Sequence, residues 1–185
     1  TSMTSIGSFA EVESPASGDL TDIGHIRAAV EDRLARLINF DPGVPPNLQA
    51  ALRHALMGQS KRVRPTLMYL IAEPHPAANG AVLDAACALE MVHTASLIID
   101  DLPCMDDAAM RRQRPTTHVA FGQPTAILSA IALLTQAFGI VAALDDVPAD
   151  TRSRLAGVLS DAVGWNGLVA GQEIVSIDGK ATSGW

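Results

Sequence analysis

The sequence contains few aromatic residues and few cysteines. Phe, Trp and Tyr together make up 4% of the chain, so the core must come mainly from aliphatic residues, among which Ala and Leu favour helices. The two cysteines, Cys87 and Cys104, are too few for a disulfide framework or a zinc cluster. We therefore expect aliphatic side chains on helices to form the core, without disulfides and without zinc.

The chain also has fewer basic residues than acidic ones, 13 against 20. The net charge is -7 at pH 7, which leaves no broad basic surface of the kind that gives nucleic-acid binders their affinity. No signal peptide opens the chain. We expect a cytoplasmic protein without a nucleic-acid partner, in which any cluster of arginines has a local task.

The chain divides by composition into a short leader and one larger unit. Residues 1–20 are rich in Ser, Gly, Pro and Glu and show no periodicity, which predicts a flexible leader. From residue 21 onward apolar residues recur at three to four residue spacing, and no alternating run typical of a strand interrupts them. Residues 21–185 are therefore expected to form one all-α domain or part of one.

The helix boundaries follow from this spacing and from residues that start and stop helices. Asn47 is predicted to be the N-cap of the second helix, and Pro65 the first residue of the third. Gly164 and Gly167 are expected to loosen the last helix. The expected helices cover residues 23–38, 47–56, 65 onward, 76–99, 126–144 and about 149–172.

The run at residues 126–144 carries no charge and is long enough to span a bilayer. Its polar residues and its acidic flank, Asp145 and Asp146, count against a membrane helix, which would be anchored by Lys or Arg. We therefore expect no membrane span, and instead a helix that is buried on all sides within a helical bundle.

The most informative segment is "DDLPCMDDAAMRRQRPTTH" at residues 100–118, which follows directly on an apolar helical run. Carboxylates bind divalent cations, and guanidinium groups bind phosphates. Arg111 and Arg112 follow the aspartates closely enough to hold an anion that a metal leaves exposed. The segment therefore predicts a site for a metal-bridged polyphosphate.

Asp100 and Asp106 are the predicted magnesium ligands. On a regular helix their six-residue spacing would point them well apart. Pro103 removes a helical hydrogen bond and distorts the turn between them, which lets the second carboxylate swing back toward the first. Magnesium keeps few protein ligands and prefers hard oxygens, so a pair of carboxylates that shares it with phosphate suits it.

A solvated acidic turn is the ordinary alternative for such a charge run. The apolar helix that leads into it counts against this alternative, because carboxylates delivered at the end of a buried segment need a cationic partner. His93 lies seven residues before Asp100, on the same helix face, with Ser96 between them. A lone histidine would be assigned to the core. His93 is included in the candidate site because of its position relative to Asp100.

A second basic cluster, "GQSKRVRP", places Lys61, Arg62 and Arg64 immediately before a helix start. Three cations beside backbone NH groups would suit a second diphosphate. Taken alone, such residues are more often solvated in a loop. Together with the aspartate segment, they indicate two diphosphate substrates.

The segment at residues 100–118 resembles the first aspartate-rich motif of the trans-isoprenyl diphosphate synthases, in its longer bacterial form. The resemblance covers residues 23–172 and is nearest to the bacterial geranylgeranyl diphosphate synthases of carotenoid pathways. It implies an all-α bundle around a central apolar cavity, in a homodimer that uses Mg²⁺. The expected reaction joins an allylic diphosphate, farnesyl diphosphate, to isopentenyl diphosphate and yields geranylgeranyl diphosphate.

The resemblance also assigns roles to single residues. Asp100 and Asp106 would bind magnesium with Asp101 in support, and Arg111 would hold the allylic diphosphate. Isopentenyl diphosphate would be held by a second set of residues, and Gln172 would make a further substrate contact. That second set is Lys61, Arg64, His93 and Arg112.

Product length is assigned in the same way. In the family a bulky aromatic residue about one turn before the first aspartate shortens the cavity. Here that position is Ala95, with the small Ser96 beside it. These residues imply the longer, geranylgeranyl product.

The chain departs from the family pattern in places. Gln59 and Ser60 replace the usual glycine pair, and Val175 stands where an acidic residue is common. The family's second aspartate-rich motif lies on later helices that this chain does not contain. We therefore expect residues 21–185 to be the N-terminal part of the domain, and the 185 residues alone to be inactive.

The sequence is also compatible with other function classes. One is a farnesyl diphosphate synthase, and another is a non-catalytic partner subunit of a synthase. A plain helical scaffold would bind no magnesium with a diphosphate. A terpene cyclase would not need the second diphosphate site at Lys61 and Arg64.

Overall fold

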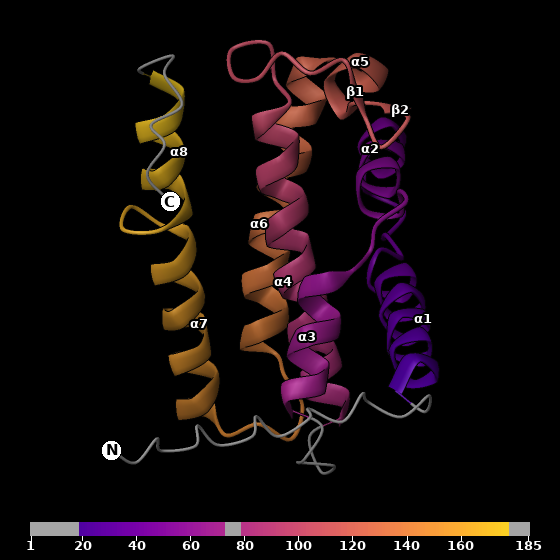
Figure 1. Ribbon diagram of the computed structural model, residues 1–185, viewed down its shortest axis with the longest axis vertical. Helices are drawn as coiled ribbons and strands as arrows, with labels where there is room; N and C mark the ends of the chain where they lie inside the picture. Colours follow the sequence, from indigo (N-terminus) through magenta and orange to yellow (C-terminus); the bar gives the residue numbers. More distant parts are fainter. Residues whose placement is uncertain (1–18, 73–78, 178–185) are drawn as a thin grey trace, which may run out of the picture.

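The computed structural model describes residues 19–72 and 79–177, and most of them lie in helices (Figure 1). The predicted all-α class is confirmed. Of the predicted leader, residues 1–18 lie outside the described residues, and Asp19 and Leu20 already belong to the first helix. The elements in chain order are α1 (Asp19–Leu37), α2 (Pro46–Leu56), α3 (Val63–Ala72), α4 (Asn79–Asp100), β1 (Met110–Arg111), β2 (Arg114–Pro115), α5 (Thr117–Phe121), α6 (Gln123–Ala142), α7 (Ala149–Val163) and α8 (Leu168–Ile177).

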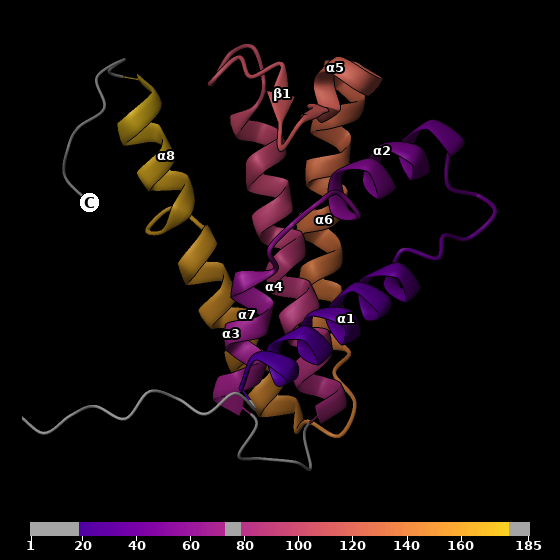
Figure 2. The ribbon, with the colours of Figure 1, turned by 45° about the vertical axis from the view of Figure 1, so that its right-hand side comes forward.

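Helix α4 stands at the centre of the bundle. It packs along α6, and α1, α2 and α3 also contact it (Figures 1 and 2). Helices α7 and α8 follow each other in one column on the opposite side from α1 and α2. This arrangement places the end of α4, where the aspartates begin, between the two sides of the bundle.

The core consists of aliphatic side chains from α1, α2, α4 and α6, as the composition predicts. Val30, Leu34, Leu56 and Met91 are among its largest fully buried members. Alanines such as Ala88, Ala95, Ala126, Ala130 and Ala137 are also buried where α4 and α6 pack. Side chains this small let the two helix backbones approach closely, and burial of each larger aliphatic side chain stabilises the fold by roughly 1.5–3 kcal/mol.

Helix α6 is buried on one face only, so the expectation of burial on all sides is wrong. Ala126, Ala130 and Leu133 face the core, whereas Leu128 and Ile131 are more than half exposed. Both the segment Gly80–Asp100 of α4 and the whole of α6 are long and apolar enough to cross a membrane, by length and composition. The core face of α6 packs against α4, and the absence of a membrane span stays a prediction.

Two predicted helix starts are wrong by one or two residues. Helix α2 begins at Pro46, with Pro45 rather than Asn47 at the N-cap, because proline at the first position is already set for the helix. Asn47 instead donates a hydrogen bond of 3.1 Å from Nδ2 to Oγ1 of Thr125. Helix α3 begins at Val63, so that Pro65 lies within its first turn, where a missing N–H costs nothing.

The last predicted helix is two helices, α7 and α8. The turn between them brings the backbone of Gly167 so close to α7 that a Cβ atom there would lie 2.1 Å from the carbonyl oxygen of Ala162. Only glycine fits such an approach. The glycines therefore break the helix, where the sequence predicted that they would loosen it.

A small hairpin contradicts the prediction that no strands occur. Strands β1 and β2 pair antiparallel, with Met110 opposite Pro115 and Arg111 opposite Arg114. The two residues of the tight turn, Arg112 and Gln113, have φ angles of 51° and 64°. Positive φ at both central residues is typical of a two-residue hairpin turn. Each strand of this hairpin has only two residues, which is too short to show an alternating pattern in the sequence.

Candidate active site

The chain folds back on itself directly after α4. The amide of Asp106 donates a hydrogen bond of 2.9 Å to the carbonyl oxygen of Asp100, and the amide of Asp107 donates one of 3.1 Å to that of Leu102. Pro103 lies within this turn. The backbone of Asp106 thus returns to Asp100, and a metal ion shared by the two carboxylates stays a prediction.

The carboxylate of Asp106 affects the titration of Asp100. Burial raises the pKa of Asp100, and the nearby negative charge of Asp106 raises it further, while Arg111 lowers it. Like charges that are held close disfavour ionisation unless a cation joins them. A divalent cation would relieve this repulsion.

The donor set at this turn, a pair of carboxylates, fits magnesium. Among the described residues no group of three or more His, Cys, Asp or Glu side chains is close enough to hold a metal ion. Magnesium is commonly held by one or two carboxylates, with waters and phosphate oxygens completing its shell. Asp100 and Asp106 would be its ligands from this chain.

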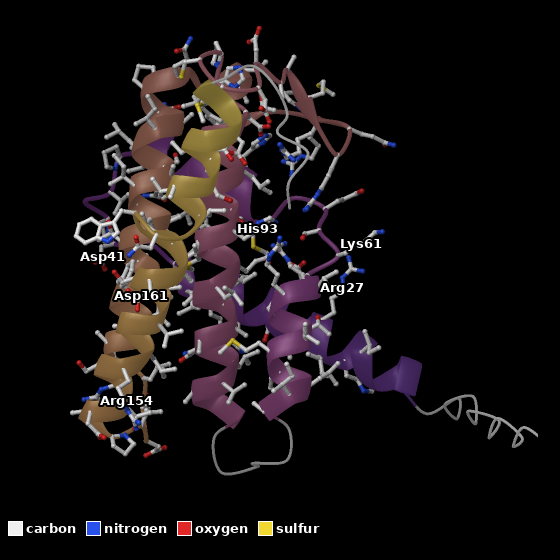
Figure 3. All side chains as sticks on the ribbon, turned by 60° about the vertical axis from the view of Figure 1, so that its left-hand side comes forward. Arg27, Asp41, Lys61, His93, Arg154 and Asp161 are labelled. Atoms are coloured by element: carbon white, nitrogen blue, oxygen red, sulfur yellow. The ribbon has the colours of Figure 1, made fainter. Side chains whose placement is uncertain are left out.

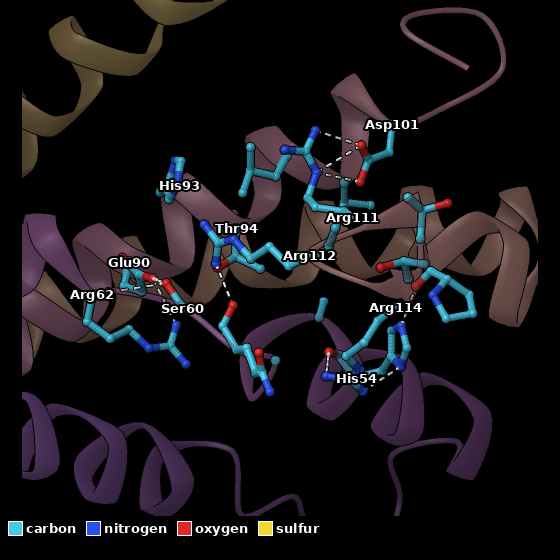
Figure 4. Close-up of a pocket in the computed structure, with 18 residues that line it drawn as sticks. His54, Ser60, Arg62, Glu90, His93, Thr94, Asp101, Arg111, Arg112 and Arg114 are labelled. Atoms are coloured by element: carbon cyan, nitrogen blue, oxygen red, sulfur yellow. Dashed lines mark hydrogen bonds and ion pairs between the residues drawn. The ribbon is translucent and has the colours of Figure 1, made fainter. Parts of the chain in front are cut away.

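The carboxylate of Asp101 holds Arg111. Asp101 is buried, and it accepts hydrogen bonds of 2.7 and 2.9 Å at Oδ1 from Nη2 and Nε of Arg111, and one of 3.0 Å at Oδ2 from Nε (Figure 4). These bonds raise the pKa of Arg111. Asp101 therefore links the aspartate turn to the arginine of β1, and its predicted support of a magnesium ion stays a prediction.

The hairpin is attached to α2 through His54. Nη2 of Arg114 donates to Nδ1 of His54 over 3.0 Å, and Nε2 of His54 lies 2.8 Å from the carbonyl oxygen of Pro115. Because arginine only donates, Nδ1 must accept and Nε2 must carry the proton. The ring also packs edge-on against Phe121, with centroids 5.3 Å apart.

A basic cavity of about 650 Å³ is lined in part by Arg112 of the hairpin turn. Four residues that the sequence assigns to the second diphosphate line it: Lys61, Arg64, His93 and Arg112. Nη1 of Arg64 lies 3.1 Å from Nε2 of His93, and Nη1 of Arg112 donates to the carbonyl oxygen of Gln59 over 3.0 Å. The structure therefore brings together side chains from a loop, two helices and the hairpin turn.

The protonation of His93 follows from these neighbours. Burial lowers its pKa, and the positive charge of Arg64 lowers it further. Nε2 accepts the hydrogen bond from Arg64, so the neutral ring carries its proton on Nδ1. His93 can thus orient Arg64 without adding a charge of its own.

Arg62 corrects the prediction that three cations of the loop face a diphosphate. Its side chain is 1% exposed, and it donates to Glu31 over 2.7 Å from Nε and to Glu90 over 2.8 Å from Nη1. A further hydrogen bond of 2.5 Å runs from Nη2 to the carbonyl oxygen of Leu56. Arg62 therefore fastens the loop to α1 and α4, and its charge is not available to a ligand.

A small cavity of about 70 Å³ connects the acidic and basic parts of the site. Asp101 and Arg111 line it on one side, and Ser60, Glu90 and His93 on the other (Figure 4). Groups bound at the two parts would therefore be neighbours.

An apolar cavity of about 270 Å³ begins beside the first aspartate. Ala95, Ser96 and Gln172, which the sequence assigns to product length and substrate contact, all line it together with Asp100. Its remaining walls are apolar residues of four helices, namely Val92, Ile99, Ala130, Ile131, Leu134, Val163, Leu168 and Val169. The side chain of Val175 lies outside the described residues.

Several residues at the site are missed by reasoning from the sequence. Arg27 and Glu31 have the spacing of a solvent-facing helix side, and Glu90 sits within an apolar run. His54 and Arg114 lie 60 positions apart in the chain. Nothing in a single sequence signals these pairings, because they depend on how the helices pack.

Comparison with known proteins shows the family. A sequence model of the polyprenyl synthetase family matches residues 45–175, and the chain belongs to this family. It is 43% identical over 153 residues to a geranylgeranyl diphosphate synthase of Pseudescherichia vulneris and 45% identical over 147 residues to that of Pantoea ananas. It is also 42% identical over 148 residues to a farnesyl diphosphate synthase of Geobacillus stearothermophilus.

These alignments cover 82%, 78% and 79% of this chain, and 50%, 48% and 50% of the respective relatives. The chain thus spans about half the length of the curated relatives it matches. Among solved structures, a geranyltransferase from Legionella pneumophila superimposes with a TM-score of 0.84 and 32% identity. That superposition covers 90% of this chain and 59% of the other.

Proposed function

We propose that this chain is part of a magnesium-dependent prenyltransferase that condenses farnesyl diphosphate with isopentenyl diphosphate to give geranylgeranyl diphosphate and diphosphate. The main support for this proposal is the position of two cavities. Asp100 lines an apolar cavity. A basic cavity nearby is lined by Lys61, Arg64, His93 and Arg112. This arrangement suits an apolar chain with a diphosphate head beside a second diphosphate.

Asp100 and Asp106 are the proposed magnesium ligands. When bound, magnesium neutralises the charge that develops on the diphosphate as it leaves. Asp101 keeps Arg111 beside these carboxylates, where its guanidinium can pair with the allylic diphosphate. Lys61 and Arg64 are the proposed partners of isopentenyl diphosphate, and His93 orients Arg64.

The reaction needs an exact separation of polar and apolar groups. The C–O bond of the allylic diphosphate breaks, and the diphosphate takes the electron pair. The double bond of isopentenyl diphosphate then attacks the allylic cation, and the new chain loses a proton to the diphosphate that has left. Water would quench the cation, so the apolar walls of the cavity beside Asp100 serve to exclude it.

The small side chains of Ala95 and Ser96 favour the geranylgeranyl product, because they leave the cavity open one turn from Asp100. A farnesyl diphosphate synthase is the second candidate function, supported by the 42% identity to the Geobacillus stearothermophilus enzyme. A non-catalytic partner subunit would not need the paired carboxylates.

A homodimer in the cytoplasm completes the proposal. Its support in the structure is the outer face of α6, where Ile127 and Leu128 are 41% and 57% exposed. An apolar face of this kind is typical of a surface that another protein covers.

The proposal is tested in the protein with its complete coding sequence. Asp100→Asn and Asp106→Asn should each lower turnover of farnesyl and isopentenyl diphosphates at least about a hundredfold, because the metal supplies several kcal/mol of transition-state stabilisation. Asp107→Asn is the matched control, since Asp107 is exposed at a φ of 49°, which asparagine tolerates. Normal turnover in both ligand variants at saturating magnesium would refute the proposal.

A further inference from the structure

We propose that Arg27 of α1 is a further diphosphate-binding residue, acting with Lys61, Arg64 and Arg112 in the basic cavity. This inference rests on the proposed function and names an additional contact for the second substrate. Arg27 lines the same cavity as these three cations, which belong to a loop, a helix and the hairpin turn. Figure 3 shows Arg27 beside Lys61, on the side of α4 that carries His93.

The position of Arg27 follows from a fixed neighbour. Glu31 lies one helical turn further along α1, and residues four apart share a helix face. Oε1 and Oε2 of Glu31 accept hydrogen bonds of 2.7 and 3.1 Å from Nε and Nη2 of Arg62, whose side chain is buried. Because Arg62 also belongs to the loop that carries Lys61, this ion pair sets the rotation of α1 and turns Arg27 toward the cavity.

The charge balance of the cavity calls for an anion. Among its lining residues the one carboxylate is Glu90, which is 2% exposed and already accepts hydrogen bonds from Arg62 and Ser60. Neither Arg27 nor Lys61 forms a hydrogen bond or ion pair with any other residue of the described ranges 19–72 and 79–177. Cations that share a cavity without a carboxylate partner repel one another until an anion joins them.

The shape of the guanidinium group selects the kind of anion. Arginine presents a planar fork of donors that matches phosphate oxygens, and these charge-assisted hydrogen bonds are among the stronger ones. The allylic diphosphate is assigned to the aspartate turn, so the ligand of Arg27 is the diphosphate of the second substrate. Inorganic diphosphate carries the same group and serves as a probe that needs no turnover.

The test compares Arg27→Gln with Arg36→Gln. Arg36 lies on the same helix, is exposed, and pairs with Asp32 at 2.6 Å, away from the basic cavity. Binding of inorganic diphosphate, measured by calorimetry without magnesium, should weaken roughly tenfold or more in Arg27→Gln, and Arg27→Lys should lose less. In the active protein the KM for isopentenyl diphosphate should rise by a similar factor, while the KM for farnesyl diphosphate stays the same.

The outcomes separate this inference from the proposed function. Diphosphate binding that depends on Arg27, in a protein with its complete coding sequence but without prenyltransferase activity, would support the inference and refute the function. An active protein in which Arg27→Gln and Arg36→Gln behave alike would overturn the inference and leave the function intact. Absence of diphosphate binding in the unmodified protein would also overturn it.

Discussion

Nη1 of Arg62 donates a hydrogen bond of 2.8 Å to Oε1 of Glu90, and both side chains are almost completely buried. Glu31 of α1 accepts from the same guanidinium group, so a single arginine joins α1, α4 and the loop between α2 and α3. Lys61, which precedes Arg62 in the loop, and Arg64, which follows two residues later in α3, line the basic cavity. A buried ion pair thus positions the cations that remain exposed.

We predict that Arg62→Met destabilises the fold strongly. The substitution leaves Glu90 buried without its cation, and removal of one partner from a buried pair typically costs about 3–5 kcal/mol. Urea unfolding followed by circular dichroism measures the change in the free energy of unfolding. Arg36→Met, which removes an exposed pair with Asp32, should change it by less than about 1 kcal/mol. Equal stability of the two variants would show that the buried pair is not a stabilising element.

The titration of His93 provides a second prediction. Burial and Arg64 lower its pKa, Arg112 and Arg111 act in the same direction, and Glu90 opposes them. In Arg64→Gln the pKa of His93 should therefore move up toward the ordinary histidine value, without reaching it because burial remains. The imidazole proton signals in an NMR pH titration report this shift, and an unchanged pKa would contradict it.

The same shift has a consequence for stability. Because the folded-state pKa of His93 is lowered, the unfolded chain binds the proton more tightly. The free energy of unfolding should therefore fall as the pH drops from the unfolded-state pKa toward the folded-state pKa, with no contribution from His93 above that window. In His93→Gln the pH dependence should be weaker across this window, which urea unfolding at several pH values would measure.

His54 is predicted to hold the hairpin in place. His54→Phe keeps an aromatic ring against Phe121 but removes the hydrogen bonds to Arg114 and Pro115. Loss of two such bonds should lower the free energy of local opening of the hairpin by about 1–2 kcal/mol. The amide of Thr116, which donates to the carbonyl oxygen of Ala109, should then exchange with solvent roughly five to thirty times faster.

Asn47→Ala is the control for this measurement. Asn47 also links α2 to a later element, through its 3.1 Å hydrogen bond to Thr125, but it does not contact the hairpin. Exchange of the Thr116 amide should stay unchanged in this variant. The same exchange rate in His54→Phe and Asn47→Ala would rule out the proposed attachment.

Product length provides the fourth prediction, which depends on the proposed function. Ala95 is 6% exposed and lines the apolar cavity beside Asp100. In Ala95→Phe the ring should fill the space available to the growing chain, and the product should shift from geranylgeranyl toward farnesyl diphosphate. Chromatography of the products measures the shift, and Ala95→Ser, which adds one oxygen atom, should leave the product unchanged. Unshortened products from Ala95→Phe would place the end of the cavity elsewhere.

Local features of the sequence are enough to predict the helical class and part of the site. Three-to-four residue spacing indicates helices because each turn is held by hydrogen bonds between near neighbours. The return of Asp106 to Asp100 follows from Pro103 within a seven-residue segment, and the seven-residue spacing of His93 and Asp100 follows from helix geometry. Each of these relationships is contained in a short stretch of chain.

Packing alone decides which charges are buried and which face a ligand. Lys61, Arg62 and Arg64 look alike in the sequence, yet Arg62 is buried because Glu31 and Glu90, 31 and 28 positions away, meet it there. Arg27 has the spacing of a solvated helix face, yet the rotation of α1 brings it to the basic cavity. The exposed side of α6 also carries large apolar residues such as Leu128, and only the packing against α4 shows which side is covered. The sequence therefore determines the helices and the local turn, whereas the contacts between distant elements determine the basic cavity, because a charge becomes buried or available only through the residues that surround it.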